Sequence, residues 1–185
     1  VMAGLVFSGL RVWNDVMSKA PADAEHIEIM GKQFAWTVRY AGADGKFGNY
    51  NYKLMDDEKG NPLGVDFSDV RTFDDFSNTS ELHIPVGKPV MLDIRARDVL
   101  HSVFIPHMRV KMDAVPGMPT KFYFTATKTT EDMRKETGNP KFNYEIACTE
   151  ICGRSHFGMK MLLVVDDKAT YAKWKADQKP MLTEN

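Results

Sequence analysis

The stretch Cys148-Thr149-Glu150-Ile151-Cys152-Gly153-Arg154-Ser155-His156-Phe157-Gly158-Met159 contains both cysteines of this 185-residue chain. It brings two thiols, one imidazole and one thioether into a short segment, from Cys148, Cys152, His156 and Met159. Thiolate and imidazole ligands suit copper and zinc better than hard cations. The thioether favours copper, because zinc sites use Cys, His and carboxylate. The stretch therefore predicts a copper site.

The number of donors bears on the kind of copper site. A mononuclear electron-transfer copper uses one Cys, two His and a weak axial Met, so one thiolate would be left over here. If both thiolates bridge, they can hold two copper ions side by side, with one imidazole on each ion. His156 supplies one imidazole, and the candidates for the other are His26, His83, His101 and His107.

Two other uses of the cysteines stay open from the residues alone. Cys148 and Cys152 could form an ordinary disulfide, which is compatible with a place outside the cytoplasm but leaves His156 and Met159 unexplained. A structural zinc ion could bind the two cysteines together with His156 and His101. The spacing excludes a Cys-x-x-Cys redox motif, and a cysteine nucleophile would not need a second cysteine.

The stretch resembles the copper loop of subunit II of the haem-copper cytochrome c oxidases, which has the form Cys-x-Glu-x-Cys-x-x-x-His-x-x-Met. Every defined position matches, at Cys148, Glu150, Cys152, His156 and Met159. Upstream, residues 98–102 are similar to the family segment that carries the other ligand histidine, which makes His101 the second imidazole. Residues 110–117 and 31–36 resemble two further family segments, so the similarity covers the chain from residue 5 to residue 176.

The resemblance implies a binuclear copper centre, CuA, and a function in electron transfer. Its implied metal ligands are His101, Cys148, Glu150, Cys152, His156 and Met159. In the family Glu150 would bind copper weakly through its backbone carbonyl, and its side chain would reach a magnesium ion at the boundary with subunit I. CuA would accept electrons from a c-type cytochrome and pass them to haem in subunit I, where oxygen is reduced and protons are pumped. The oxygen-reducing site would therefore lie outside this chain.

The same resemblance implies the surroundings of the protein. Its partners would be subunit I, other oxidase subunits and a c-type cytochrome. Its location would be a respiratory membrane, with the copper domain on the outer face, in a bacterial periplasm rather than a mitochondrial intermembrane space. Two other functions stay open. One is the CuA domain of nitrous oxide reductase, which follows a large propeller domain, and the other is a copper carrier or assembly protein, which favours exchangeable sites rich in exposed Met or Cys.

Composition and apolar patterning indicate one folded β domain. With 43% hydrophobic and 11% aromatic residues the chain can bury a sizeable core, and a net charge of −1 gives no reason to expect nucleic acid binding. Residues 90–96 alternate between apolar and polar side chains, which is typical of a half-buried strand. Similar strands are expected at 26–30, 33–40, 99–105, 121–126, 144–147 and 161–165. This pattern predicts an all-β sandwich or barrel, and the resemblance narrows it to a cupredoxin-like Greek-key sandwich.

Each end of the chain is expected to be helical. Residues 1–10 are apolar and are followed by Arg11, but they are too few to span a bilayer, which needs about 20 residues. They lack the basic start of a signal peptide. Because the family places a membrane hairpin before its copper domain, we expect residues 1–12 to be the outer end of a transmembrane helix that anchors the protein; a short amphipathic surface helix is the alternative. A short C-terminal helix is expected at 167–178.

These expectations divide the chain into three parts. Residues 1–19 would be the end of a transmembrane helix and a linker, residues 20–166 the cupredoxin-like CuA domain, and residues 167–185 the C-terminal helix and tail. Within the domain, residues 43–82 contain nine acidic and four basic residues, a local charge of −5. Complementary charge raises encounter rates, so this segment favours a basic electron donor; a merely solvated segment is the alternative.

The aromatic segment departs from the family pattern. The family commonly has Gln-Trp-x-Trp, with the first tryptophan as the surface port for the electron, where this chain has Gln33-Phe34-Ala35-Trp36. Phenylalanine lacks the indole ring, so we expect Trp36, rather than Phe34, to be the sensitive residue in electron uptake. The alternative is that Trp36 belongs to the core and the donor approaches the copper loop directly.

Overall fold

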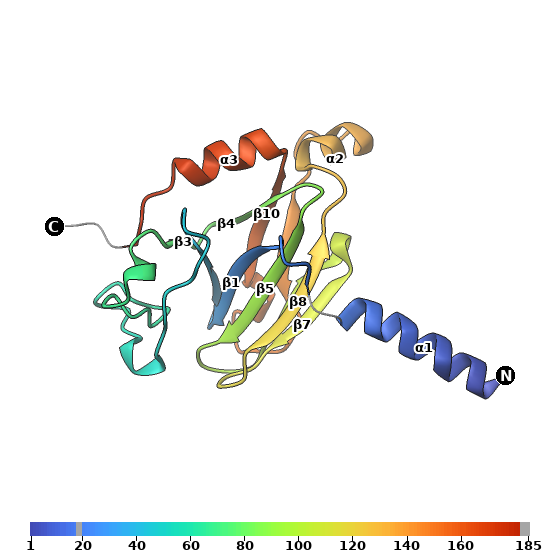
Figure 1. Cartoon of the computed structure of the whole chain (residues 1–185), viewed down its shortest axis with the longest axis horizontal. Helices are drawn as coiled ribbons and strands as arrows, with labels where there is room; N and C mark the ends of the chain where they lie inside the picture. The colour runs from blue at the N-terminus through green and yellow to red at the C-terminus, as the bar shows by residue number, and fades with distance from the viewer. Residues whose placement is uncertain (18–19, 182–185) are drawn as a thin grey trace.

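Short apolar strands build two five-stranded sheets in the computed structural model, which describes residues 1–17 and 20–181 (Figure 1). The first sheet has the order β3-β2-β1-β5-β8. Within it β1 pairs antiparallel with β2 and parallel with β5. Its strands are β1 (Glu25–Lys32), β2 (Ala35–Tyr40), β3 (Phe76–Asn78), β5 (Pro89–Ala96) and β8 (Thr120–Thr125).

The second sheet has the order β4-β10-β9-β6-β7 and also contains one parallel pair, β4 with β10. The strands β9 and β10 form an antiparallel hairpin, and β6 pairs with β9 on its other side. The ligand-bearing ends of β6 and β9 are therefore neighbours. The strands of this sheet are β4 (Glu81–Pro85), β6 (His101–Ile105), β7 (Val110–Ala114), β9 (Tyr144–Cys148) and β10 (Lys160–Asp166).

The inner faces of the two sheets share one apolar core. Along β5, the side chains of Val90, Leu92 and Ile94 are fully buried, as the period of two requires. Strand β10 does the same with Met161, Leu163 and Val165, and both sets belong to one cluster. The mostly β sandwich predicted from the sequence is confirmed.

The described residues also form three α-helices, α1 (Met2–Met17), α2 (Thr130–Thr137) and α3 (Lys168–Ala176). The predicted C-terminal helix is confirmed as α3. Asp167 is its N-cap, and the Asp167 carboxylate accepts from the N–H groups of Ala169 and Thr170. Helix α2 begins with a capping box formed by Thr129 and Asp132. Four short 3₁₀ turns complete the structure, η1 (Tyr52–Leu54), η2 (Val70–Thr72), η3 (Pro106–Met108) and η4 (His156–Gly158).

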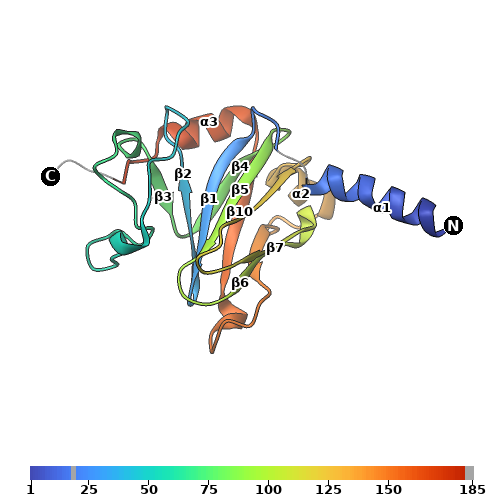
Figure 2. The same ribbon diagram turned by 60° about the horizontal axis from the view of Figure 1, so that its bottom comes forward.

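Helix α1 extends away from the sandwich in both views (Figures 1 and 2), and all its residues are exposed. Of the helices in the described ranges, none combines the length and the apolar character needed to cross a bilayer. The assignment of residues 1–12 as the outer end of a transmembrane helix stays a prediction. Residues 18–19 of the predicted linker and 182–185 of the predicted tail lie outside the described residues.

Several elements differ from the sequence prediction. The predicted strand at 33–40 begins only at Ala35, because Gln33 and Phe34 form the turn between β1 and β2. Strands β3, β4 and β7 and helix α2 were not predicted. β3 has only three residues, and the capping box of α2 lies in a charged segment without a wide apolar face. Strands β3 and β4 depend on pairing with the distant strands β2 and β10, which periodicity in one segment does not reveal.

Candidate metal centre

The stretch from Cys148 to Met159 is the connection of the β9–β10 hairpin at one end of the sandwich, seen as the orange loop below β6 and β10 in Figure 2. Its two ends are joined, since the Cys148 N–H donates to the Met159 carbonyl over 3.0 Å. The Thr149 N–H donates to the carbonyl of Ser102, which links the loop to β6. The loop therefore carries its donors on a frame fixed by two strands.

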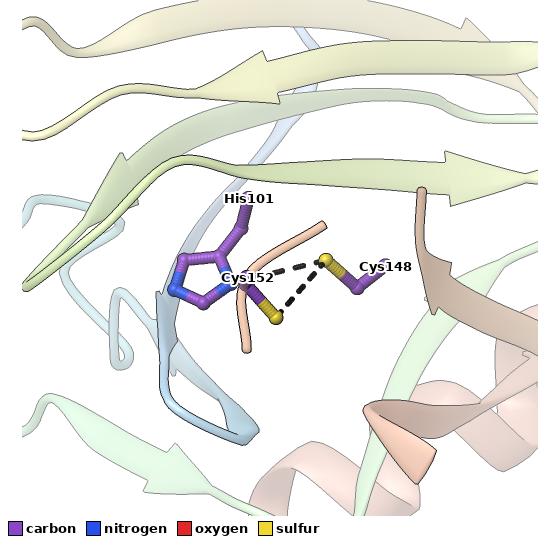
Figure 3. A group of neighbouring side chains, drawn as sticks. All are labelled: His101, Cys148 and Cys152. Carbon is purple, nitrogen blue, oxygen red and sulfur yellow. Dashed lines mark hydrogen bonds between the residues drawn. The ribbon is translucent and has the colours of Figure 1, made fainter. Parts of the chain in front are cut away.

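His101 reaches the loop from the first position of β6. The donor atoms of His101, Cys148 and Cys152 lie within 4.8 Å of one another, and all three residues are buried (Figure 3). The structure thus brings together residues that are 47 positions apart in the chain. Of the four histidines considered as the second imidazole, His101 is the one placed beside the thiols.

The donor atoms form a chain of nearly equal steps. Cys148 Sγ lies 3.8 Å from His101 Nδ1 and 3.9 Å from Cys152 Sγ. Cys152 Sγ lies 3.7 Å from His156 Nδ1 and 3.8 Å from Met159 Sδ. Both cysteines are free thiols, so the disulfide alternative is not what this structure contains.

These steps fit a bound transition metal. Ligands held at about 2.0–2.3 Å from one ion in a tetrahedral site are about 3.3–3.8 Å from each other. Each cysteine sulfur lies at nearly this distance from one histidine nitrogen and from the other cysteine sulfur. Thiolate, imidazole and thioether together suit copper, so the residues present fit a copper site.

Glu150 contributes its backbone. Its carbonyl oxygen lies 3.2 Å from Cys148 Sγ, on the site side of the loop, whereas its residue as a whole is exposed. The role of this carbonyl as a weak copper ligand stays a prediction. The magnesium role of the side chain stays a prediction.

Two residues that the sequence did not single out orient the ligands. Asp98 Oδ1 lies 2.9 Å from His101 Nε2, the ring nitrogen that does not face the thiols. Gln33 donates its backbone N–H to Asp98 Oδ2 over 2.8 Å and its side-chain amide to the carbonyl of Cys152 over 2.5 Å. Metal-binding histidines commonly donate their second N–H to such a carboxylate, so a carboxylate three residues before His101 was the available signal for Asp98.

The surroundings of the site shift the pKa values of Asp98 and Cys152 in opposite directions. Burial alone would raise the pKa of Asp98, but hydrogen bonds from Gln33, His101 and Val99 outweigh it and lower that pKa, so Asp98 stays ionised beside His101. Burial and the neighbouring Cys148 raise the pKa of Cys152 to about 11. The Cys152 thiol is therefore protonated near pH 7 without an ion, and metal binding must displace its proton.

The aromatic segment is arranged differently from the prediction. Trp36 is 1% exposed and packs edge-on against His101, with ring centroids 5.9 Å apart. A surface location for Trp36 is thus wrong, because the second residue of β2 points into the core. Phe34 precedes the strand, is partly exposed and lies close to Gly153 of the loop. The alternative of a core tryptophan describes the structure.

The acids of residues 43–82 are largely bound within the fold. Asp57 accepts from Lys32 and Arg97, and Asp75 accepts from Arg39, all three cations lying outside the segment. Further pairs within or next to it are Asp56 with Lys59, Asp69 with Arg71 and Glu81 with His83. The field that this segment presents to a partner is therefore weaker than its charge of −5 suggests.

Comparison with known proteins places this geometry in context. Residues 26–167 match the family described as cytochrome C oxidase subunit II, periplasmic domain. The chain is 35% identical over 179 residues to the alternative cytochrome c oxidase subunit 2 of Bradyrhizobium diazoefficiens, covering 96% of this chain and 59% of that protein. It is 36% identical over 121 residues to cytochrome c oxidase subunit 2 of Thermostichus vulcanus, covering 65% of this chain and 33% of that protein. The chain thus spans less than two thirds of either relative.

A solved structure agrees with the sequence relatives. The periplasmic domain of subunit II of the cytochrome oxidase of Bradyrhizobium japonicum superposes with a TM-score of 0.57 at 26% identity, covering 85% of this chain and 95% of that one. A second structure holds such a domain in a mixed disulfide with a thioredoxin-like protein, with a TM-score of 0.54 at 25% identity and coverage of 86% and 94%.

Proposed function

Because this chain belongs to the family of the cytochrome c oxidase subunit II periplasmic domain, we propose that it is the electron-accepting part of a haem-copper terminal oxidase. The observation that carries this proposal is the unbroken series of donor atoms from His101 through Cys148 and Cys152 to His156. Two copper ions bound there as CuA would supply one-electron redox chemistry. The finer fold name, a cupredoxin-like Greek key, is part of the proposal.

The chain's own residues would hold the copper centre rigidly. The two thiols lie centrally in the donor series, and His101 and His156 lie at its two ends, with Met159 and the Glu150 carbonyl beside single sulfurs. The ligands His101, Cys148, Cys152 and Met159 are buried and held by two paired strands. Such a frame keeps ligand positions nearly constant between oxidation states, which favours electron transfer.

Electron uptake is proposed to occur beside Phe34. Its ring atoms Cε1 and Cζ would lie 2.9 Å from a Cβ on Gly153, so the ring covers the copper loop next to Cys152. Gln33, its neighbour, donates to the Cys152 carbonyl. A c-type cytochrome that docks here would meet the copper loop directly. Because much of the acidic segment is internally paired, the docking should depend only weakly on salt.

Contacts with the rest of an oxidase are proposed for the exposed side of the loop. The Glu150 side chain is available for a magnesium ion at the boundary with subunit I, to which the electron would pass. Glu150→Gln keeps the backbone carbonyl, so copper content should stay near normal. Electron transfer from CuA to subunit I should fall only in the whole complex. Loss of copper from the isolated chain on this substitution would contradict the proposal.

The location is proposed to be the outer face of a bacterial respiratory membrane, as the periplasmic family suggests. Helix α1 carries exposed Leu5, Phe7, Leu10 and Trp13, which supports residues 1–19 as a membrane-proximal helix and linker before the copper domain at 20–166 and the C-terminal part at 167–185. The mixed disulfide of the structural relative supports a thioredoxin-like partner that keeps Cys148 and Cys152 reduced before copper binds.

A copper carrier or assembly protein is the weaker candidate. Carriers release their ion readily, whereas His101, Cys148, Cys152 and Met159 are each less than a tenth exposed. The nitrous oxide reductase alternative is not favoured, because the family match is to an oxidase subunit. The rate at which a chelator removes copper would separate a carrier, which releases its ion quickly, from a closed electron-transfer site, which releases it slowly.

The deciding experiment is copper analysis of the chain with optical and paramagnetic resonance spectra. We expect two copper ions per chain, a coloured protein and one electron shared by both ions. Reduced c-type cytochrome should then reduce the centre in stopped-flow mixing. One copper per chain, or a zinc site that copper does not displace, would overturn the proposal.

A further inference from the structure

Gly31 lies against the imidazole of His101 and the indole of Trp36. A Cβ on Gly31 would be 2.8 Å from Trp36 Cζ3 and 3.1 Å from His101 Cγ and Cδ2. The first distance is shorter than real Cβ contacts and the second is unusually tight. A side chain at residue 31 would therefore have to displace one of the two rings.

The backbone of Gly31 cannot move aside to make this room. Gly31 is opposite Trp36 in the β1–β2 pair and opposite Ala96 in the β1–β5 pair, so it lies in the interior of the first sheet. Its carbonyl also accepts from the N–H of Arg97 over 2.9 Å. Its φ is not positive, so glycine is required here for space rather than for backbone conformation.

The rings themselves have little freedom. Trp36 is 1% exposed and His101 is fully buried. The His101 ring is held at Nε2 by Asp98, while Nδ1 faces Cys148 Sγ at 3.8 Å. Because Nδ1 is bonded to Cγ, a displacement of Cγ by a methyl group would change the direction of Nδ1.

We propose that Gly31 and Trp36 are positioning residues for the copper centre, which together form the seat of the His101 ring and set the direction of its Nδ1. The proposal rests on the proposed copper function. Under this proposal, residues 31–36 also set the orientation of a copper ligand from the core side of the site, a role distinct from electron uptake at the surface.

The test compares copper-loaded full-length chains. Gly31→Ala should shift the optical bands and the copper hyperfine pattern and lower copper affinity in chelator competition by about 10–100-fold, the usual effect of disturbing a ligand's supporting residues. Trp36→Phe should shift the same spectrum, because the ring loses its lateral support. In the double variant Gly31→Ala/Trp36→Phe, the added methyl takes space vacated by the indole, so the spectrum should return towards that of the unmodified chain.

Gly48→Ala is the matched control. A Cβ on Gly48 would collide with Thr72, so this variant also loses thermal stability, but it touches no copper ligand. Its copper spectrum should be unchanged. An unchanged spectrum and affinity in Gly31→Ala would overturn the inference alone, as would equal spectral shifts in Gly31→Ala and Gly48→Ala. If Gly31→Ala does not fold, an unshifted spectrum in Trp36→Phe overturns it and a shifted one supports it. Failure of the unmodified chain to bind copper would instead overturn the proposed function, and this inference with it.

Discussion

Two groups of buried polar side chains in this molecule differ in the spacing of their atoms. One is the charge cluster of Glu28, Arg39, Asp75 and Arg95, which lies between the first sheet and the loops of residues 42–75. Arg39 Nε lies 3.1 Å from Asp75 Oδ2, and its Nη1 lies 3.3 Å from Glu28 Oε2. Arg95 also pairs with Glu28. These atoms meet at hydrogen-bond distances.

Four of the proposed copper ligands, His101, Cys148, Cys152 and Met159, are also buried, but their donor atoms do not meet. The donor atoms of the site, His156 Nδ1 included, are 3.7–3.9 Å apart. This is too long for strong hydrogen bonds and close to the separation of two ligand atoms bound to one tetrahedral ion. The comparison separates two kinds of buried polar group. The charge cluster pairs its two arginines with its two acids, whereas the spacing of the His101, Cys148, Cys152 and His156 donor atoms fits a bound ion.

The substitution with the largest expected effect is Cys148→Ser, which acts on the proposed copper site. Both neighbours of Cys148 Sγ, His101 Nδ1 and Cys152 Sγ, lose their shared partner, so the binuclear spectrum should disappear completely. Copper content and paramagnetic resonance measure this. The apo chain should still fold, because a serine hydroxyl here can donate to the Glu150 carbonyl, as Cys148 Sγ does over 3.2 Å. If Cys148→Ser kept the binuclear spectrum, the spacing of the donor atoms would not identify a copper site, and the contrast with the charge cluster would fail.

The next largest effect belongs to the charge cluster. Arg39→Met leaves Asp75 and Glu28 without their shared cation, and removing one member of a buried ion pair costs about 3–5 kcal/mol of unfolding free energy. Denaturant titration of the apo chain measures this loss. The copper spectrum of the folded fraction should be unchanged, because no metal ligand contacts Arg39. A changed spectrum would show that the charge cluster also affects the geometry of the proposed copper site.

Removal of copper should give an intermediate effect. An ion that binds only the folded chain stabilises it by about 2.7 kcal/mol at a hundredfold excess over its Kd. For a chain of this size that corresponds to a thermal midpoint higher by about 5–10 °C. Calorimetry with and without a chelator measures the difference, and Cys148→Ser is the control in which the chelator should do little. Equal midpoints in the unmodified chain would indicate a site already satisfied without metal.

The sequence indicated the donor residues of the site more clearly than the residues that support them. Cys148, Cys152, His156 and Met159 stand in one loop, where ligand chemistry is visible in the residue types. His101 came from resemblance alone. Gly31 and Gln33 act on the site from a hairpin far earlier in the chain, and no spacing rule connects a glycine in a strand with a histidine 70 residues later.

The charge cluster was not predicted for a related reason. Glu28 and Arg39 occupy the polar positions of strands β1 and β2, which normally face water. Here the loops of residues 42–75 cover that face, with Gly48 and Leu63 offering carbonyls to the two arginines. A segment counted from sequence as an acidic surface thus supplies Asp75 to the interior. Local charge gives no information on which acids a tertiary contact will neutralise.

The smallest expected effect concerns His83, a third buried polar group, and it depends on pH. Its Nδ1 lies 2.6 Å from Asp166 Oδ2, its Nε2 lies 2.9 Å from Glu81 Oε1, and its ring stacks on Trp174 of α3. Burial alone would lower the pKa of His83, but the hydrogen bonds and charges of Asp166 and Glu81 outweigh it and raise that pKa. Like the charge cluster, this group pairs opposite charges within the fold.

The direction of the pH effect follows from linkage. The folded chain holds the His83 proton more tightly than the unfolded chain, whose histidine pKa is about 6.5. The stabilisation is therefore complete below about pH 6.5 and is lost as pH rises through the higher folded pKa. Denaturant titrations of the apo chain across that window should show unfolding free energy falling with pH, and His83→Gln should flatten the fall. The same slope in His83→Gln would assign the effect to other groups, whereas a flat profile in both chains would mean that His83 is already neutral between its two carboxylates.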